Sequence, residues 1–246
     1  MHDEVSGTVP LVTESPTRIA RDLFAPLAPG YERWAEILSM GQDGRWRSRM
    51  IAQLAIEPGE VALDVAAGTG SITRLLQDRG ADVVSLDQSH QMLVPAVRRG
   101  ATGVVATAER LPFDDAQFDV VTFGYLLRYV EDVAGAMAEL TRVVRPGGRV
   151  GMVEFGRPSG VWLPLWRLYT RLVLPTAGLV AGEGWPEVGR FLGPNIEDFG
   201  GRFPPGRLAR IWEDAGLSRV GFTRLSLGGG LVMWAKKGTA SSSETR

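Results

Sequence analysis

The residues best suited to chemistry in this chain are Gly68 and Gly70, followed by the acidic Asp87. The glycines end the segment Val61–Gly70, in which apolar residues surround Asp64 as in a strand buried on both faces. Glycines permit a sharp turn and leave no side chain between the backbone and a ligand. Asp87 closes a second apolar run about twenty residues later, where a nucleotide-type βαβ unit holds ribose hydroxyls. This spacing predicts a nucleoside-binding site.

The glycine turn also bears on which nucleoside is bound. A dinucleotide fingerprint needs a third glycine so that a helix N-terminus can approach a pyrophosphate, and that position is Thr73. The sequence holds no G-x-x-x-x-G-K-[ST] phosphate loop. A cofactor with a ribose but no phosphate fits better, which points to S-adenosyl-L-methionine. A nicotinamide-binding oxidoreductase is disfavoured by Thr73, and a purely structural glycine pair is the simpler alternative.

Alternating strand and helix patterns must position these residues. Apolar runs predict strands at 61–66, 82–86, 103–106, 118–123 and 149–155, with helices at 71–79, 91–98 and 133–143 between them. Pro146 and the two glycines after it predict a turn at 145–148. Segments 219–225 and 230–236 read as an antiparallel hairpin across a glycine-rich turn. The pattern predicts an α/β fold with a doubly wound, Rossmann-like, mostly parallel seven-stranded sheet, whose carboxyl edge carries the functional residues.

The chain is expected to form one domain over residues 16–237, between a disordered stretch at 1–15 and a disordered tail at 238–246. Helical patterns at 16–57 precede the first strand and would cover a pocket as a lid or pack on the sheet edge. A helical insertion at 156–201 carries Trp162 and Trp166, then Arg167 and Arg171, at i, i+4 spacing. Core packing, a hydrophobic pocket wall and peripheral membrane contact all remain open for it.

Composition narrows the class of protein. The 246 residues are 44% hydrophobic and 22% charged, as in a soluble globular protein. A net charge of −1 and a pI near 6.2 give no electrostatic footprint for nucleic acid. The absence of cysteine excludes disulfides and thiolate zinc sites, and no other metal-ligand cluster is apparent. We expect a cytoplasmic location, since no secretory signal or membrane-spanning run is found. We also expect the protein to be a monomer or a homodimer.

The order of these segments resembles class I S-adenosylmethionine-dependent methyltransferases and, more narrowly, the ubiquinone/menaquinone biosynthesis C-methyltransferase family. The resemblance covers about residues 24–237. The segments that carry it are 31–34, 38–43, 63–70, 87–93, 108–113, 127–130, 145–149 and 154–155. It implies methylation of a hydrophobic aromatic small molecule, such as carbon methylation of a prenylated, demethylmenaquinol-like quinol.

Three positions depart from the family pattern. Arg128-Tyr129 stands where the family has Arg-Asn, Thr107 replaces an aspartate near the adenine amino group, and Leu126 replaces a glycine. These departures weaken the assignment of a quinol acceptor more than the assignment of the cofactor. They keep open a specialised metabolite methylated on carbon, oxygen or nitrogen, and a non-catalytic binding module that retains the fold.

The resemblance implies a set of cofactor-binding residues. The loop backbone would cradle the methionine portion, Asp64 would attract its ammonium group or cap the turn, and Asp87 would hold the ribose. Met92 would pack on adenine or simply in the helix core. The full cofactor set comprises Asp64, Ala66, Gly68, Thr69, Gly70, Asp87, Gln88, Met92, Thr107, Ala108 and Glu109.

Four residues are predicted to act on the methyl acceptor. Arg128, which always carries charge, would stabilise a developing phenolate, although a surface position is equally open. Tyr125 and Tyr129 would hydrogen-bond the acceptor or pack in the core. Glu154 would act as a general base if desolvation raises its pKa. No metal is expected to take part.

Overall fold

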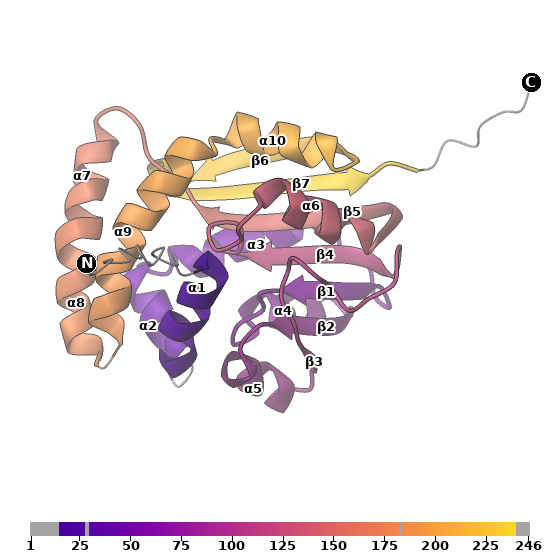
Figure 1. The fold of residues 1–246 in the computed structure, drawn as a ribbon, viewed down its shortest axis with the longest axis horizontal. Helices are drawn as coiled ribbons and strands as arrows, with labels where there is room; N and C mark the ends of the chain where they lie inside the picture. Colours follow the sequence, from indigo (N-terminus) through magenta and orange to yellow (C-terminus); the bar gives the residue numbers. More distant parts are fainter. Residues whose placement is uncertain (1–14, 28–29, 183, 240–246) are drawn as a thin grey trace, which may run out of the picture.

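The computed structural model describes residues 15–27, 30–182 and 184–239 (Figure 1). The predictions for 1–15 and 238–246 fall almost entirely outside this part of the chain. The described residues form a seven-stranded sheet of order β3-β2-β1-β4-β5-β7-β6. The strands are β1 Val61–Val65, β2 Asp82–Asp87, β3 Thr102–Val105, β4 Phe118–Gly124, β5 Val144–Phe155, β6 Leu217–Leu225 and β7 Gly230–Lys237.

The pairing of the strands confirms the predicted sheet. Strand β1 pairs in parallel with β2 and β4, and the parallel arrangement continues to β3 on one side and β5 on the other. Strand β7 is antiparallel to both β5 and β6. The hairpin therefore joins the sheet through its second strand, which leaves β6 at the edge. A short 3-10 turn, Ser226–Gly228, links the two strands.

The start of β5 differs from the prediction. The strand begins at Val144, so the segment 145–148 is part of it and not a turn that precedes it. Phe118 pairs with Val144 and Val120 with Arg149, so an irregularity in β5 absorbs the extra residues. Gly147 has a φ of +79°, which glycine adopts without strain. The proline and glycines thus produce a bulge within the strand, where we had expected a turn.

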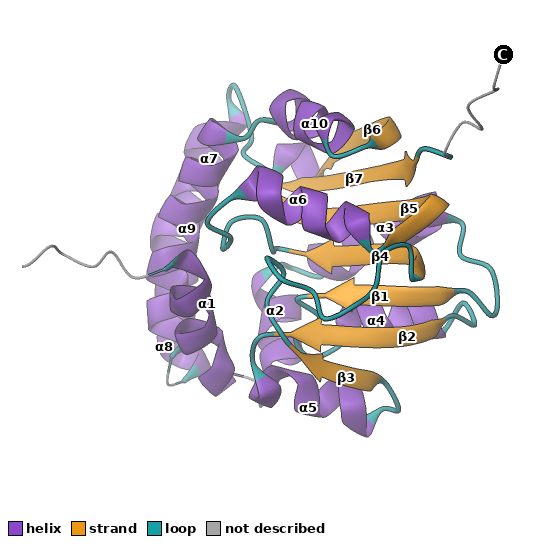
Figure 2. Cartoon of the chain, turned by 45° about the vertical axis from the view of Figure 1, so that its right-hand side comes forward, coloured by secondary structure: helices purple, strands orange, loops and turns teal. Residues whose placement is uncertain are grey.

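Helices cover both faces of the sheet. On one face lie α3 (Gln42–Leu54), α4 (Ser71–Gln77) and α5 (His90–Arg98); on the other lie α6 (Val133–Arg142) and α10 (Pro205–Asp214) (Figure 2). The α6 and α10 face buries Phe123, Met137 and Trp212. The α3 and α4 face buries Met50 and Leu76. This double covering explains why the central strands read as continuous apolar runs.

A further helical layer crosses the carboxyl ends of the parallel strands (Figures 1 and 2). Its elements are α1 (Pro16–Phe24), α2 (Tyr31–Leu38), α7 (Trp162–Leu168), a π-helical turn (Tyr169–Val173), α8 (Leu174–Ala181) and α9 (Trp185–Arg202). Leu27, Trp185 and Val188 join the N-terminal helices to α9 in a separate small core. In the N-terminal region, α3 packs on a face of the sheet, while α1 and α2 lie over the strand ends.

Candidate cofactor and acceptor site

A cavity of about 590 Å³ lies between the strand ends and the helical layer. This volume is typical of a small-molecule site. Most of the predicted site residues line it: Ala66, Gly68, Thr69, Asp87, Gln88, Met92, Thr107, Ala108, Glu109, Tyr125, Arg128 and Tyr129. Three predicted site residues, Asp64, Gly70 and Glu154, do not line it.

The loop after β1 is held in left-handed backbone conformations. Ala66, Gly68 and Gly70 have φ values of +55°, +55° and +88°. A Cβ atom on Gly70 would lie 2.7 Å from the Cβ of Ala96, so this glycine admits the close approach of α5. Gly70 therefore faces α5, and Gly68 is the glycine at the cavity wall.

Asp87 is fixed at the end of β2 by the backbone. Its two carboxylate oxygens accept the N–H groups of Gly68 and Ser89, each at 2.9 Å. Burial raises the pKa of Asp87, while these amide hydrogen bonds oppose the rise. Each oxygen retains a lone pair for a ligand hydroxyl. A fixed carboxylate at this place suits a ribose and repels a phosphate, so the residues present fit an adenosyl group that carries none.

Helix α1 reaches the same region through Thr17, a residue that sequence reasoning missed. The Thr17 hydroxyl lies 2.9 Å from the Glu109 carboxylate and 2.8 Å from the carbonyl oxygen of Tyr129. The side chain of Gln88 donates to the carbonyl oxygen of Thr17 at 2.9 Å. The N-terminal helix is thereby joined to loops that follow three different strands of the sheet.

Asp64 lies beneath the loop and away from the cavity. Its carboxylate accepts the hydroxyls of Thr73, at 2.8 Å, and Thr122, at 3.1 Å, and it is fully buried. The predicted contact with the cofactor ammonium group is therefore not supported. Thr73, which stands at the third glycine position of a dinucleotide fingerprint, instead supplies a hydrogen bond to this buried carboxylate. Burial raises the pKa of Asp64 to about 6.

We expect Asp64 to make stability depend on pH. Its pKa rises from 3.8 when unfolded to about 6 when folded, so the native state binds more protons between these values. The favourable contribution of Asp64 to the free energy of unfolding is complete below pH 3.8 and is lost as the pH rises through about 6. Relative to Asp64→Asn, the free energy of unfolding should fall by about 2 kcal/mol from pH 4 to 7. Urea unfolding of both proteins across this range measures the difference, and a constant difference would contradict it.

Arg128 lines the cavity and forms a buried ion pair with Glu154, which does not line it. Their side chains are 1% and 0% exposed, and the Nε atom of Arg128 lies 2.9 Å from Oε1 of Glu154. Arg128 also donates to the side-chain oxygen of Asn195 in α9, at 3.0 Å. Burial raises the pKa of Glu154, while Arg128 opposes the rise. Glu154 faces Arg128 and not the cavity, so the structure does not support it as a general base. It positions Arg128.

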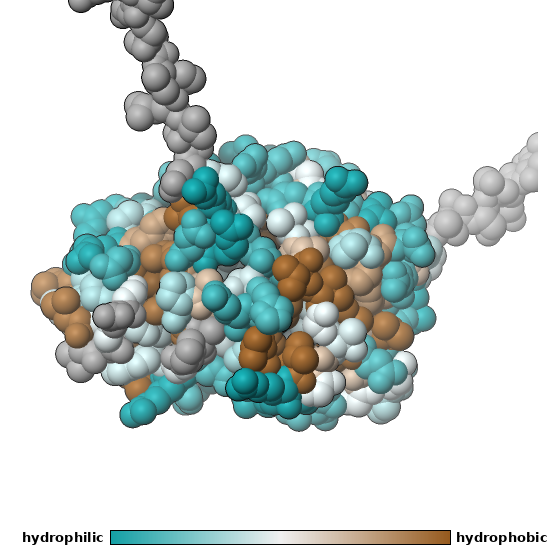
Figure 3. All heavy atoms as spheres, turned by 60° about the horizontal axis from the view of Figure 1, so that its bottom comes forward, coloured by the Kyte–Doolittle hydropathy of each residue, from teal (hydrophilic) through white to brown (hydrophobic). Residues whose placement is uncertain are grey.

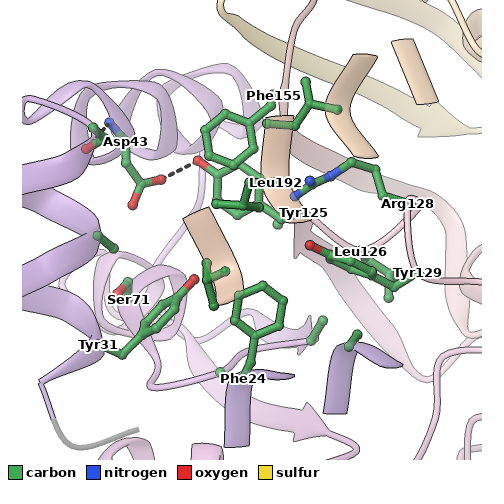
Figure 4. A pocket seen from close by; sticks show the side chains of 18 of the residues that line it. Phe24, Tyr31, Asp43, Ser71, Tyr125, Leu126, Arg128, Tyr129, Phe155 and Leu192 are labelled. Carbon is green, nitrogen blue, oxygen red and sulfur yellow. Dashed lines mark hydrogen bonds between the residues drawn. The ribbon is translucent and has the colours of Figure 1, made fainter. Parts of the chain in front are cut away.

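Two tyrosines line the cavity beside Arg128 (Figure 4). Tyr125 donates its hydroxyl to the carboxylate of Asp43, and its ring stacks on Phe155 at 4.5 Å between centroids. The Tyr129 hydroxyl is buried, and no residue in the described part of the chain accepts or donates a hydrogen bond to it. Burial raises the pKa of Tyr129 to about 12, so this hydroxyl is protonated at neutral pH.

Sequence reasoning also missed two charged cavity residues on α3. Arg47 lies 2.8 Å from Asp43 in an ion pair whose side chains are only 12% and 10% exposed. Both residues line the cavity. The sequence feature that could have indicated them is the segment 38–43, whose polar end runs into the amphipathic helix α3. Only the packing of α3 against the sheet shows that this end faces Tyr125.

Comparisons with known proteins agree with this architecture. The ubiE/COQ5 methyltransferase family matches residues 12–237. The demethylmenaquinone methyltransferase of Tropheryma whipplei (strain Twist) is 35% identical over 214 residues, covering 85% of this chain and 87% of that protein. The corresponding enzyme of Beutenbergia cavernae is 37% identical over 218 residues, covering 85% and 86%.

Solved structures show the same fold at low sequence identity. A methyltransferase from Thermotoga maritima, described as a possible histamine N-methyltransferase, covers 88% of this chain and 99% of its own, with a TM-score of 0.62 and 18% identity. Magnesium protoporphyrin IX methyltransferase from Synechocystis, solved with S-adenosylmethionine bound, covers 92% and 99%, with a TM-score of 0.60 and 17% identity. The family match carries more than the fold: the chain is an S-adenosyl-L-methionine-dependent methyltransferase and belongs to the ubiE/COQ5 methyltransferase family.

Proposed function

We propose that this enzyme methylates a ring carbon of a hydrophobic quinol of the demethylmenaquinol type. The observation that carries the proposal is the cavity itself, which runs from the carboxylate of Asp87 to an aromatic chamber beside a buried arginine, Arg128. The aromatic side chains of that chamber include Phe24, Tyr31, Phe155, Trp162 and Trp185. The names of the demethylmenaquinone methyltransferase relatives support the same acceptor.

The cofactor end is formed by residues of the first two strand ends. Asp87 would hold the ribose hydroxyls, Gly68 and Thr69 would leave the loop backbone open to the methionine portion, and Met92 would pack on the adenine. When bound, the cofactor supplies a methyl group already activated by its sulfonium sulfur. The protein is left to position the acceptor and to exclude water, which are the larger parts of such catalysis.

The acceptor end is formed around Arg128. Glu154 and Asn195 hold two of its nitrogens, so its guanidinium is fixed at the wall of the cavity. A fixed cation beside the acceptor stabilises the phenolate that makes a ring carbon nucleophilic. The buried hydroxyl of Tyr129, whose ring centroid lies 4.9 Å from the guanidinium carbon, would hydrogen-bond an acceptor oxygen.

The test is a direct assay of the purified protein. With radiolabelled cofactor and detergent-solubilised demethylmenaquinol kept reduced, we expect label in a lipid product, and none with the oxidised quinone. Mass spectrometry of the product locates the methyl group on carbon or oxygen. Cofactor binding by calorimetry without any methylated product from reduced quinols would overturn the quinol assignment.

A second acceptor class is favoured by one specific feature. Leu126 stands at the cavity wall where the resembled family has glycine, and Tyr129 stands where it has asparagine. Both side chains are bulkier and reduce the space beside Arg128. A smaller specialised metabolite, methylated on carbon, oxygen or nitrogen, would fit such a chamber, and a panel of phenols and amines in the same assay separates the two classes.

We also propose that the helices over the cavity contact a membrane surface. Five apolar side chains follow one face of α7, the π-helical turn and α8, and we call them the apolar ridge: Val161, Leu165, Leu168, Leu172 and Leu179. Their exposed fractions run from 55% to 82%. Leu165 and Leu168 also line the cavity, so the ridge is continuous with it. Apolar side chains gather at the left edge of the molecule in Figure 3, where α7 and α8 lie in Figure 1.

Charge beside the apolar ridge favours an anionic lipid surface. Arg157, Arg167 and Arg171 surround the single carboxylate of Glu197, which leaves an excess of two positive charges. Juxtamembrane arginines contribute about 1 kcal/mol each on anionic membranes. In the described part of the chain no helix is long and apolar enough to cross a bilayer. We propose a peripheral contact at the cytoplasmic face, made by a monomer or a homodimer.

The apolar ridge gives a prediction for vesicle binding. The triple variant Val161→Ser, Leu172→Ser, Leu179→Ser alters ridge residues outside the cavity wall. We expect its partitioning onto phosphatidylglycerol vesicles to fall at least tenfold in co-sedimentation, since each apolar side chain contributes about 1–3 kcal/mol on burial. A matched triple variant, Val97→Ser, Val105→Ser, Phe222→Ser, alters exposed apolar residues elsewhere. Equal partitioning of both variants would contradict the proposed contact.

A further inference from the structure

A second polar centre lies in the cavity, apart from Arg128. The Tyr125 hydroxyl donates to the Asp43 carboxylate (Figure 4). The same carboxylate also pairs with Arg47 at 2.8 Å. Asp43 comes from the start of α3 and Tyr125 from the end of β4, so tertiary packing alone brings them together. The Asp43 side chain is 10% exposed. Such a carboxylate, hydrogen-bonded to a tyrosine hydroxyl at a cavity wall, is suited to proton transfer.

The orientation of Tyr125 is fixed from several sides. Its backbone adopts a φ of +58°, a conformation that an aromatic residue rarely takes. Its ring stacks on Phe155, and the guanidinium carbons of Arg47 and Arg128 lie 5.7 Å and 5.9 Å from the ring centroid. Because its hydroxyl proton is committed to Asp43, its oxygen lone pairs remain available to accept a proton from a ligand.

We propose that Asp43 and Tyr125 form the proton acceptor of the methyl transfer. Tyr125 takes the hydroxyl proton of the bound phenol while its own proton passes to Asp43. This inference deepens the proposed function and depends on a hydroxylated acceptor in the same cavity. It assigns general-base catalysis to α3 and Tyr125, where the sequence had suggested Glu154.

The step balances in atoms and charge. The O–H bond of the acceptor breaks, and its electron pair makes the neighbouring ring carbon nucleophilic. That carbon forms a bond to the methyl group as the bond from methyl to sulfonium sulfur breaks, with the electrons left on sulfur. The ring carbon then loses its hydrogen as a proton to solvent, and the proton on Asp43 returns through Tyr125 to the acceptor oxygen. One proton is released for each positive charge lost from sulfur.

The charges around the pair suit this exchange. Arg47 lies on α3 beside Asp43, Tyr31 on α2 faces both, and Arg128 lies across the Tyr125 ring. Burial raises the pKa of Tyr125 well above its usual value, with Asp43 adding to the rise. Tyr125 therefore stays protonated between turnovers and acts as a relay. The two arginines stabilise the phenolate that remains on the acceptor after proton transfer.

The first test measures the proton itself, without turnover. The probe is 4-nitro-1-naphthol, whose phenolate absorbs visible light, added to the full chain without cofactor. In the wild type we expect the phenolate band below the solution ionisation pH of the probe. The infrared difference spectrum should show the carbonyl stretch of a protonated carboxyl group at the same time. Asp43→Asn should lack the carboxyl band, and Tyr125→Phe, which retains the aromatic ring, should lack both bands.

The second test uses kinetics. General-base catalysis contributes about 100-fold or more, so kcat should fall by that factor in Asp43→Asn and Tyr125→Phe with cofactor affinity unchanged. Raising the pH until the acceptor ionises in solution should restore much of the Asp43→Asn rate. Asp214→Asn, an exposed aspartate on α10, is the matched control.

The outcomes separate this inference from the proposed function. A wild type that binds the probe without the protonated carboxyl band, or Asp43→Asn turnover within threefold of wild type, would overturn the proton-accepting pair alone. Failure of the wild type to bind any phenol would overturn both. Methylation of demethylmenaquinol with unchanged turnover in Tyr125→Phe would leave the quinol assignment standing and remove the relay.

Discussion

Asp87→Ala is expected to abolish measurable binding of S-adenosyl-L-methionine and S-adenosylhomocysteine in calorimetry. The carboxylate is held by the amides of Gly68 and Ser89, so it meets the ribose without reorganisation. Hydrogen bonds to a charged group contribute about 1.5–3 kcal/mol each. Loss of two such bonds corresponds to a dissociation constant raised by about 100-fold to 10,000-fold.

The control must separate binding from folding, because Asp87 also anchors the glycine loop. Circular dichroism and thermal unfolding of Asp87→Ala show whether the sheet persists. Asp82→Ala, at the exposed start of the same strand, removes a carboxylate without touching the cavity. A folded Asp87→Ala protein that binds the cofactor within threefold of wild type would contradict the assignment of Asp87 to the ribose.

The cofactor half of the site was largely predictable from the sequence. A buried strand, a glycine turn and an acidic residue at the next strand end are local features, and their geometry follows from backbone rules. The residues for which the prediction differed depended on which way each residue faces in the folded chain. Gly70 faces α5 and Asp64 faces Thr73 and Thr122, and spacing along a strand does not show which neighbours a buried side chain meets.

The acceptor half was less predictable because it is assembled from distant segments. Thr17, Asp43 and Asn195 come from three helices that meet only when the helical layer packs over the strand ends. Glu154 stands at a strand end, as catalytic carboxylates often do, yet its side chain points to Arg128. This contact favours a positioning role for Glu154 over the predicted role as a base, and the distinction depends on a single side-chain direction.

Arg128→Met is expected to lower both stability and turnover, and a second substitution should separate the two effects. Removal of the arginine leaves Glu154 charged, fully buried and unpaired, which costs about 3–5 kcal/mol. In the double variant Arg128→Met, Glu154→Gln no charge is left buried, and methionine retains most of the volume. The free energy of unfolding measured in urea should therefore return to within about 1–2 kcal/mol of the wild-type value.

Turnover should not return with stability. If Arg128 stabilises the acceptor phenolate, the double variant keeps a kcat about 100-fold to 1,000-fold below wild type, as loss of a single oxyanion donor does elsewhere. Its affinity for the cofactor should be unchanged, since Asp87 and the glycine loop are intact. Recovery of kcat together with stability would show that the arginine serves only the packing of β5 against α9. The buried pair is thus the point at which fold and chemistry can be measured separately.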